Sequence, residues 1–171
     1  MRYVFATGLL MLTASLYGCK GMQEPRDVIA AESGETVAAA STENLTTESG
    51  EPAYIKVQHC LIAFAGTGTK ATRSKEEAEK LAIELFEKAK AGENFEAMIR
   101  KYTDDSPPGI YKMANHGFPA NGTLFEEVYA RGGMVPAFGN VGFPLQVGEF
   151  GLAAFDEQES PYGWHIVKRI E

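Results

Sequence analysis

Length, composition and charge limit the classes of protein that this sequence can encode. The chain has 171 residues, with 16 Lys and Arg against 23 Asp and Glu, for a formal net charge of −7. An acidic chain without a basic cluster is unsuited to binding nucleic acid, or to binding a membrane through a polybasic patch. The chain has two cysteines, Cys19 and Cys60. If either is modified, no disulfide can form between them, so we expect a hydrophobic core to stabilise the fold.

The first eighteen residues are typical of an export signal. Arg2 precedes an uncharged, mostly apolar run over residues 3–17, which is shorter than the roughly 20 residues of a membrane-spanning helix. Leu16-Tyr17-Gly18-Cys19 resembles a bacterial lipobox. We therefore predict a signal peptide over residues 1–18 and lipidation of Cys19, which would anchor the chain to a membrane of the bacterial cell envelope, periplasmic or otherwise extracytoplasmic. An ordinary signal peptide cleaved nearby is the alternative.

Residues 19–53 have the composition of a tether. From residue 20 onward they contain no aromatic residue, and seven acidic residues stand against Lys20 and Arg26. Such a segment cannot bury enough apolar surface to offset the entropy of ordering. The sequence therefore predicts a lipidated, disordered acidic tether over residues 19–53 and one folded domain over residues 54–171.

The domain is predicted to begin with a strand over residues 54–64. Ile55, Val57, His59, Leu61 and Ala63 are expected on one face of this strand, and Lys56, Gln58, Cys60 and Ile62 on the other. Because side chains alternate along a strand, His59 and Cys60 must point in opposite directions.

Two helices are predicted next. Ser74, followed three residues later by Glu77, forms a capping box, after which apolar residues recur at helical spacing as far as Ala89. Phe95, Met98, Ile99 and Tyr102 define a second, shorter amphipathic helix, which ends at Thr103-Asp104-Asp105.

Residues 106–144 contain five of the eight prolines and seven of the eighteen glycines, which predicts loops and short elements. A strand from Gly151, a polar turn over residues 156–162 and the apolar run over residues 163–169 then predict a terminal hairpin. This order of strand, helices, loops and hairpin indicates an α+β domain.

Five segments in fixed order make the chain resemble the parvulin family of peptidyl-prolyl isomerases. They are the strand with His59, then Tyr102-Thr103-Asp104-Asp105, Met134-Val135-Pro136-Ala137-Phe138, Val147-Gly148-Glu149-Phe150 and the strand with His165. The resemblance covers residues 54–171 and implies a four-stranded, mostly antiparallel sheet flanked by helices. It also implies peptidyl-prolyl cis/trans isomerase activity without a cofactor.

The resemblance also assigns site residues. His59 and His165 are expected to face each other as a hydrogen-bonded pair, and Asp105 stands where some parvulins have cysteine and others aspartate; these three are the predicted catalytic residues. Met134 and Phe138 are expected to form the apolar wall that holds the substrate proline. His116, at the position that is leucine-like in the family, and Tyr162 are the other predicted substrate-binding residues. Asp104 is expected to be a solvated acid.

Other chemistry is less compatible with the sequence. No metal-ligand spacing such as C-x-x-C or H-E-x-x-H occurs, so no metal site is predicted, and Cys60 faces away from His59, which argues against a Cys/His nucleophile. The loop over residues 65–74 offers only Lys70 and Arg73, without the adjacent arginines that favour phosphate capture.

The preferred hypothesis is a lipid-anchored prolyl isomerase that assists folding of unfolded or partly folded exported polypeptides containing X-Pro bonds. The main alternative is a holdase that binds the same segments without turnover. A purely structural envelope lipoprotein is the third possibility, and it would need no paired-histidine cleft.

Overall fold

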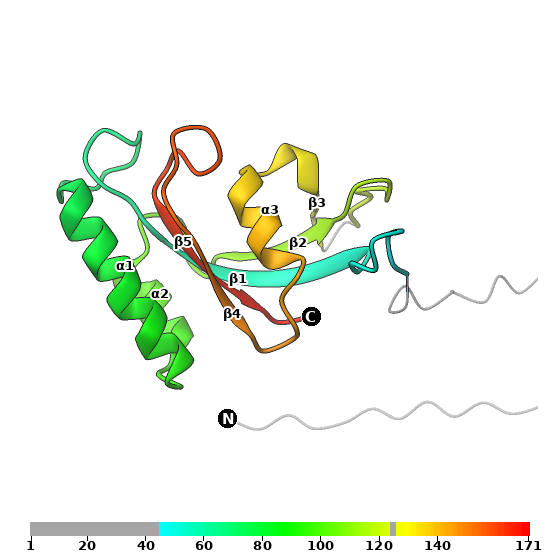
Figure 1. Ribbon diagram of the computed structural model, residues 1–171, viewed down its shortest axis with the longest axis horizontal. Helices are drawn as coiled ribbons and strands as arrows, with labels where there is room; N and C mark the ends of the chain where they lie inside the picture. Colours follow the sequence, from blue (N-terminus) through cyan, green and yellow to red (C-terminus); the bar gives the residue numbers. More distant parts are fainter. Residues whose placement is uncertain (1–44, 124–125) are drawn as a thin grey trace, which may run out of the picture. The chain divides into compact units, whose positions relative to one another are not determined.

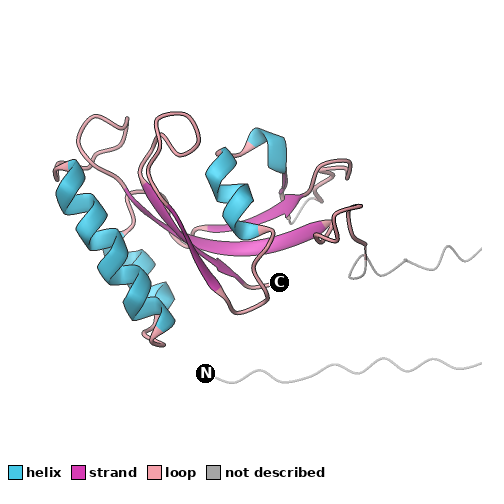
Figure 2. Ribbon diagram, in the orientation of Figure 1, coloured by secondary structure: helices cyan, strands magenta, loops and turns pink. Residues whose placement is uncertain are grey.

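The computed structural model describes residues 45–123 and 126–171. Strands and helices combine in an α+β arrangement, which confirms the predicted class (Figures 1 and 2). The elements in chain order are β1 (Tyr54–Ile62), α1 (Lys75–Lys90), α2 (Phe95–Tyr102), β2 (Ile110–Ala114), β3 (Val128–Ala130), the 3-10 turn η2 (Arg131–Gly133), α3 (Pro136–Gly142), β4 (Phe150–Ala153) and β5 (Trp164–Arg169).

The described strands form a mixed five-stranded sheet in the order β3-β2-β1-β5-β4. Strand β1 pairs antiparallel with β2 and β5, and the terminal hairpin pairs β4 antiparallel with β5. The prediction of four strands is wrong by one, because β3 runs parallel to β2 along its outer edge. With three residues, β3 is too short to give a period-two pattern in a sequence rich in glycine and proline.

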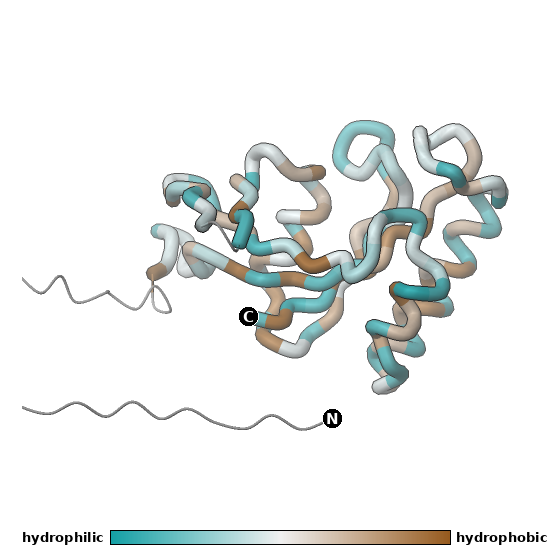
Figure 3. Tube along the Cα trace, turned by 180° about the vertical axis from the view of Figure 1, so that it is seen from behind, coloured by the Kyte–Doolittle hydropathy of each residue, from teal (hydrophilic) through white to brown (hydrophobic). Residues whose placement is uncertain are grey.

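Strand β1 has buried residues on both faces, and every one of its residues from His59 to Ile62 is buried. Cys60 and Ile62 belong to one hydrophobic cluster with α1 and α2, whereas Ile55 and Val57 belong to a second cluster with α3. We call these the helix face and the cleft face of the sheet. Figure 1 shows α1 and α2 together on one side of the strands and α3 on the other, and hydrophobic residues run along the central strands in Figure 3.

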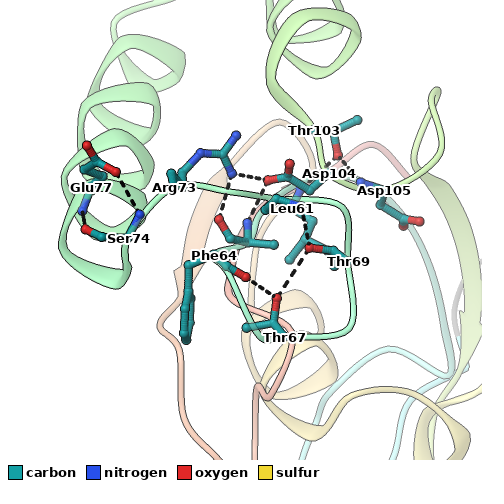
Figure 4. Close-up of polar contacts among 12 residues, drawn as sticks. Leu61, Phe64, Thr67, Thr69, Arg73, Ser74, Glu77, Thr103, Asp104 and Asp105 are labelled. Carbon is teal, nitrogen blue, oxygen red and sulfur yellow. Dashed lines mark hydrogen bonds and ion pairs between the residues drawn. The ribbon is translucent and has the colours of Figure 1, made fainter.

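Helix α1 begins where the sequence predicts. The Ser74 hydroxyl accepts a hydrogen bond from the Glu77 backbone N–H at 3.2 Å, and the Glu77 carboxylate accepts one from the Ser74 N–H at 2.7 Å (Figure 4). These two bonds form the predicted capping box. The apolar stripe of α1 is buried against the sheet, and α2 begins at an Asn94 cap and ends at Tyr102, also as predicted.

Helix α3 was not predicted, because Pro136, Gly139 and Gly142 give it low intrinsic helix propensity. Packing accounts for the helix. A Cβ atom on Gly142 would lie 3.2 Å from the Ile55 side chain and 3.5 Å from that of Val57, so glycine lets α3 approach β1 closely.

The folded unit begins before Tyr54. Ala53 is fully buried and its N–H donates to the Leu45 carbonyl at 2.7 Å. The Asn115 side chain donates to the Pro52 carbonyl at 3.0 Å, and Arg131 forms an ion pair with Glu51 at 2.7 Å. Residues 45–53, which the sequence assigned to the disordered tether, are therefore held by partners far along the chain that local composition does not reveal.

The predicted signal peptide, Cys19 and most of the predicted tether lie outside the described residues. Within residues 45–123 and 126–171, no helix has the length and apolar character needed to cross a membrane.

Candidate active site

Two strand histidines meet on the cleft face of the sheet. The antiparallel register pairs His59 with Val167 and Leu61 with His165, so the histidines are diagonal neighbours on the same face. Their Nδ1 atoms lie 3.3 Å apart, and their rings stack with centroids 5.4 Å apart at 15°. Each residue is 5% exposed or less, so the pair is buried.

The end of α2 delivers Asp105 to the same place. Thr103 Oγ1 accepts a hydrogen bond from the Leu61 N–H at 3.1 Å, and the Asp104 N–H donates to the Leu61 carbonyl at 2.9 Å. These bonds attach the segment after α2 to the end of β1. They leave Asp105 Oδ2 3.1 Å from His59 Nε2. Asp105, His59 and His165 thus form one connected group, the polar row.

Burial and hydrogen bonding fix the charge states of two members of the polar row. The hydrogen bond from His59 lowers the pKa of Asp105 to about 2, assisted by the Ser106 backbone and Tyr111 and opposed by partial burial. Burial lowers the pKa of His165 to about 3, and the neighbouring His59 contributes to this shift. At neutral pH Asp105 is therefore an anion and the His165 ring is neutral.

The geometry restricts where the ring protons lie. His59 Nε2 faces a carboxylate and carries a hydrogen, so in the contact between the two Nδ1 atoms one ring donates and the other accepts. In both arrangements His165 Nε2 is buried and has no hydrogen-bond partner among the described residues. The polar row therefore ends in an unsatisfied nitrogen that favours a neutral His165.

Asp104 differs from the solvated acid expected at this position. Its side chain is only 14% exposed, accepts a hydrogen bond from the Ala63 N–H at 2.8 Å and pairs with Arg73 (Figure 4). Arg73 also donates to the Ala63 carbonyl at 2.7 Å. Asp104 and Arg73 thereby join the end of α2 to the loop that precedes α1. This role depends on tertiary contacts, which a local sequence pattern does not reveal.

A cavity of about 330 Å³ opens beside the polar row. This volume is near the lower end of the range for small-molecule sites, roughly 300–1,000 Å³. Predicted residues Met134, Phe138 and Tyr162 line it together with all three members of the polar row. The Phe138 ring meets the His59 ring edge-on at 5.1 Å, so apolar and polar surfaces adjoin within one cavity.

His116, predicted as a substrate-binding residue, does not line this cavity. Strand β2 begins beside His59, where Gly109 O accepts the His59 N–H, and runs away from it to Ala114, which pairs with Tyr54. His116 follows the far end of that strand and is exposed. The direction of β2, which the sequence did not reveal, places His116 away from the cavity.

Tyr111 is a site residue that the sequence analysis missed. It lines the cavity, and its hydroxyl donates a hydrogen bond to Asp105 Oδ2 at 3.1 Å. The alternation of Tyr111 and Met113 on one face of β2 could have indicated an inward-facing residue, but the density of proline and glycine favoured a loop. The other unpredicted lining residues are Leu61, Gly68, Thr69, Asp104 and Val135.

Two glycines allow the backbone to approach the end of β1 that carries His59. A Cβ atom on Gly109 would lie 2.4 Å from the His59 carbonyl oxygen and 3.1 Å from the His59 ring. A Cβ atom on Gly163 would lie 2.3 Å from the Ile62 carbonyl oxygen. Both glycines have positive φ, 64° and 139°, a backbone conformation in which a residue with a side chain would be strained. Larger residues at either position would displace the strands that carry the histidines.

Cys60 has no part in this site. It is fully buried on the helix face, and burial raises the pKa of its thiol to about 12. A thiol that stays protonated under an apolar cluster is inert as a nucleophile. Within the described parts of the chain, no group of three or more His, Cys, Asp and Glu side chains is arranged to hold a metal ion.

Comparisons with known proteins agree with this geometry. Residues 42–171 match the family described as the PPIC-type PPIase domain. The solution structure of TbPIN1 superposes with a TM-score of 0.50 at 18% identity, covering 70% of this chain and 98% of that one. That likeness supports the fold.

Two further solved structures are similar over comparable lengths of this chain. Peptidyl-prolyl isomerase ESS1 from Candida albicans has 20% identity over 74% of this chain and 66% of its own, with a TM-score of 0.49. PrsA from Bacillus subtilis has 26% identity over 70% of this chain and 35% of its own, with a TM-score of 0.36.

The family match spans most of the chain, so the protein belongs to the parvulin family of PPIC-type peptidyl-prolyl isomerases. It is a peptidyl-prolyl isomerase, and its substrates are proline-containing polypeptides.

Proposed function

We propose that this parvulin catalyses cis/trans isomerisation of X-Pro bonds in exported polypeptides at the bacterial cell envelope, without a covalent intermediate and without requiring phosphate before proline. One observation carries the proposal. An apolar cavity adjoins a polar row of two buried histidines and the Asp105 carboxylate, and the described lining residues of the cavity include neither lysine nor arginine.

The chemistry follows from the bond that must rotate. Amide resonance gives the X-Pro bond a barrier of roughly 18–20 kcal/mol. An enzyme lowers it by binding the twisted amide more tightly than the planar one. In the proposed mechanism Met134 and Phe138 hold the proline ring, while the polar row replaces water around the amide carbonyl with fixed dipoles. Rotation breaks no covalent bond, so this reaction needs no nucleophile.

The absence of a phosphate requirement is supported by the loop between β1 and α1. Arg73 is engaged with Asp104 and the Ala63 carbonyl, which leaves the exposed Lys70 as the other cation of that loop. Two acids, Asp104 and Asp105, line the cavity. A substrate phosphate would meet these carboxylates without a bidentate cationic partner.

The envelope location is supported by sequence alone. The apolar run over residues 3–17 ends at the lipobox-like Leu16-Tyr17-Gly18-Cys19, and we propose that Cys19 carries the lipid. The holdase alternative is not adopted because the family match gives the protein isomerase activity.

Paired peptides test phosphate independence. NMR exchange rates of cis and trans Ser-Pro and phosphoserine-Pro peptides would be compared at catalytic amounts of the full chain. The unphosphorylated peptide should exchange at least as fast as the phosphorylated one, and Lys70→Ala should leave the ratio of the two exchange rates unchanged. A preference of more than about tenfold for the phosphorylated peptide, lost in Lys70→Ala, would refute this part of the proposal.

Fractionation of cells that express Cys19→Ser tests the anchor. The variant should be released from membranes or retain its signal peptide. A mature-sized variant that stays with the membrane fraction as wild type does would refute lipidation at Cys19.

A further inference from the structure

Tyr111 stands out because it reaches the polar row from a strand that carries none of its members. Its hydroxyl donates to Asp105 Oδ2 at 3.1 Å, and the same oxygen lies 3.1 Å from His59 Nε2. Two donors from two adjacent strands, β1 and β2, therefore converge on one carboxylate oxygen.

The Tyr111 ring is fixed independently of this hydrogen bond. It packs edge-on against His59 at 5.2 Å and Tyr129 at 5.4 Å, and near Phe138 at 6.0 Å. Because these contacts hold the ring, its hydroxyl is presented to Asp105 with little freedom to move. Removing the hydroxyl alone would leave the ring and its cavity surface in place.

In the hydrogen bond between Tyr111 and Asp105, the phenol is the donor and the carboxylate is the acceptor. Burial, and then the charge of Asp105, raise the pKa of Tyr111 to about 12, so the phenol remains a donor. An ionised carboxylate only accepts hydrogen bonds. The Asp105 side chain is 35% exposed, so without the Tyr111 hydroxyl it is less constrained than the buried histidines.

We propose that Tyr111 is a positioning residue for prolyl isomerisation: its hydroxyl holds the Asp105 carboxylate in the orientation that receives His59 and faces the cavity. The inference deepens the proposed function and rests on its assignment of the polar row. Tyr111 acts through Asp105 and not by transferring a proton, since rotation of the amide requires none.

Tyr111→Phe is the direct test, with Tyr129→Phe as the matched control. The Tyr129 hydroxyl bonds to exposed Glu127 at 2.7 Å, so its removal also deletes one phenol–carboxylate bond but leaves the polar row untouched. In Tyr111→Phe we expect kcat to fall about five- to tenfold with KM nearly unchanged, because the ring that lines the cavity remains. Tyr129→Phe should match wild type.

Carboxyl ¹³C NMR titration of Asp105 supplies a readout that packing alone would not move. Loss of a donor to the charged form should raise the Asp105 titration midpoint by about one pH unit in Tyr111→Phe. The groups facing this carboxylate are His59, the Ser106 N–H and Tyr111, so the two other donors are retained as an internal reference. Tyr129→Phe should leave the midpoint unchanged.

A double-mutant cycle separates failure of this inference from failure of the proposed function. If Tyr111 acts through Asp105, adding Tyr111→Phe to Asp105→Ala should cause no further loss of kcat. Equal Asp105 midpoints and equal kcat in Tyr111→Phe and Tyr129→Phe would overturn the inference while leaving the proposed function intact. Full activity of Asp105→Ala would overturn the site assignment, whatever titration midpoint Asp105 has in Tyr111→Phe.

Discussion

The two faces of strand β1 have adjacent residues with opposite surroundings. Cys60 faces an apolar cluster with α1 and α2, in which no member is ionised. His59, one residue earlier, faces another imidazole, a carboxylate and a cavity beneath α3. One face stabilises the sheet, and the other places polar groups where apolar packing is incomplete. Stability and function are thus divided between faces of one strand.

The largest expected effect falls on the helix face. Ile99→Ala removes a fully buried side chain of α2 and should lower the free energy of unfolding by about 2–5 kcal/mol. Because the Ile99 side chain packs in the helix-face cluster, on the other side of the sheet from the cavity, kcat/KM per folded molecule should stay near wild type. Urea unfolding measures the free energy of unfolding, and peptide exchange measures kcat/KM. A fall in kcat/KM that, converted to free energy, equals the loss of stability would contradict the division of stability and function between the two faces.

On the cleft face, His165 should make stability depend on pH. Its folded pKa is about 3 against an ordinary 6.5, so below pH 6.5 the unfolded chain binds a proton that the folded chain excludes. The free energy of unfolding should therefore fall by up to about 2 kcal/mol between pH 7 and pH 5. His165→Asn should remove that part of the slope, and an unchanged slope would show that burial of this imidazole is not its source.

The histidines should behave as one unit in catalysis. His59→Ala and His165→Ala should each reduce kcat/KM by about tenfold, since each breaks the same Nδ1–Nδ1 contact. The double variant should lose far less than the product of the two single losses. Peptide exchange in the three variants measures the coupling, and fully multiplicative losses would mean that the rings act separately.

A smaller effect is expected at the apolar side of the cavity. Met134→Ala should raise KM for X-Pro peptides about fivefold, because the truncation enlarges the space for the proline ring. Leu145→Ala is a matched control, since Leu145 packs in the same cluster without lining the cavity. Equal KM values in both variants would place the proline elsewhere.

The sequence predicts the helix face better than the cleft face, for a physical reason. Helix α1 carries its own capping box and an apolar stripe at regular spacing, and β1 carries its own alternation. The polar row was found only through resemblance to a family, because His59, Asp105 and His165 are distant in sequence and meet through strand register. Their grouping is a property of the sheet.

Other features of the cleft face depend on contacts that no local pattern encodes. Helix α3 forms despite its glycines because Gly142 packs against β1, and the ordered residues 45–53 depend on Asn115 and Arg131. The position of His116 outside the cavity has a related reason. Without the direction of β2, nothing in the sequence distinguishes an inward Tyr111 from an outward His116.

We expect catalysis to depend on the cleft face and not on the thiol behind it. NMR exchange of an unphosphorylated X-Pro peptide, with full-chain Asp105→Ala and Cys60→Ser compared against wild type, tests this most directly. We predict a loss of about tenfold to a hundredfold for Asp105→Ala and less than about twofold for Cys60→Ser. Loss of exchange in folded Cys60→Ser, together with full activity of Asp105→Ala, would contradict the claim.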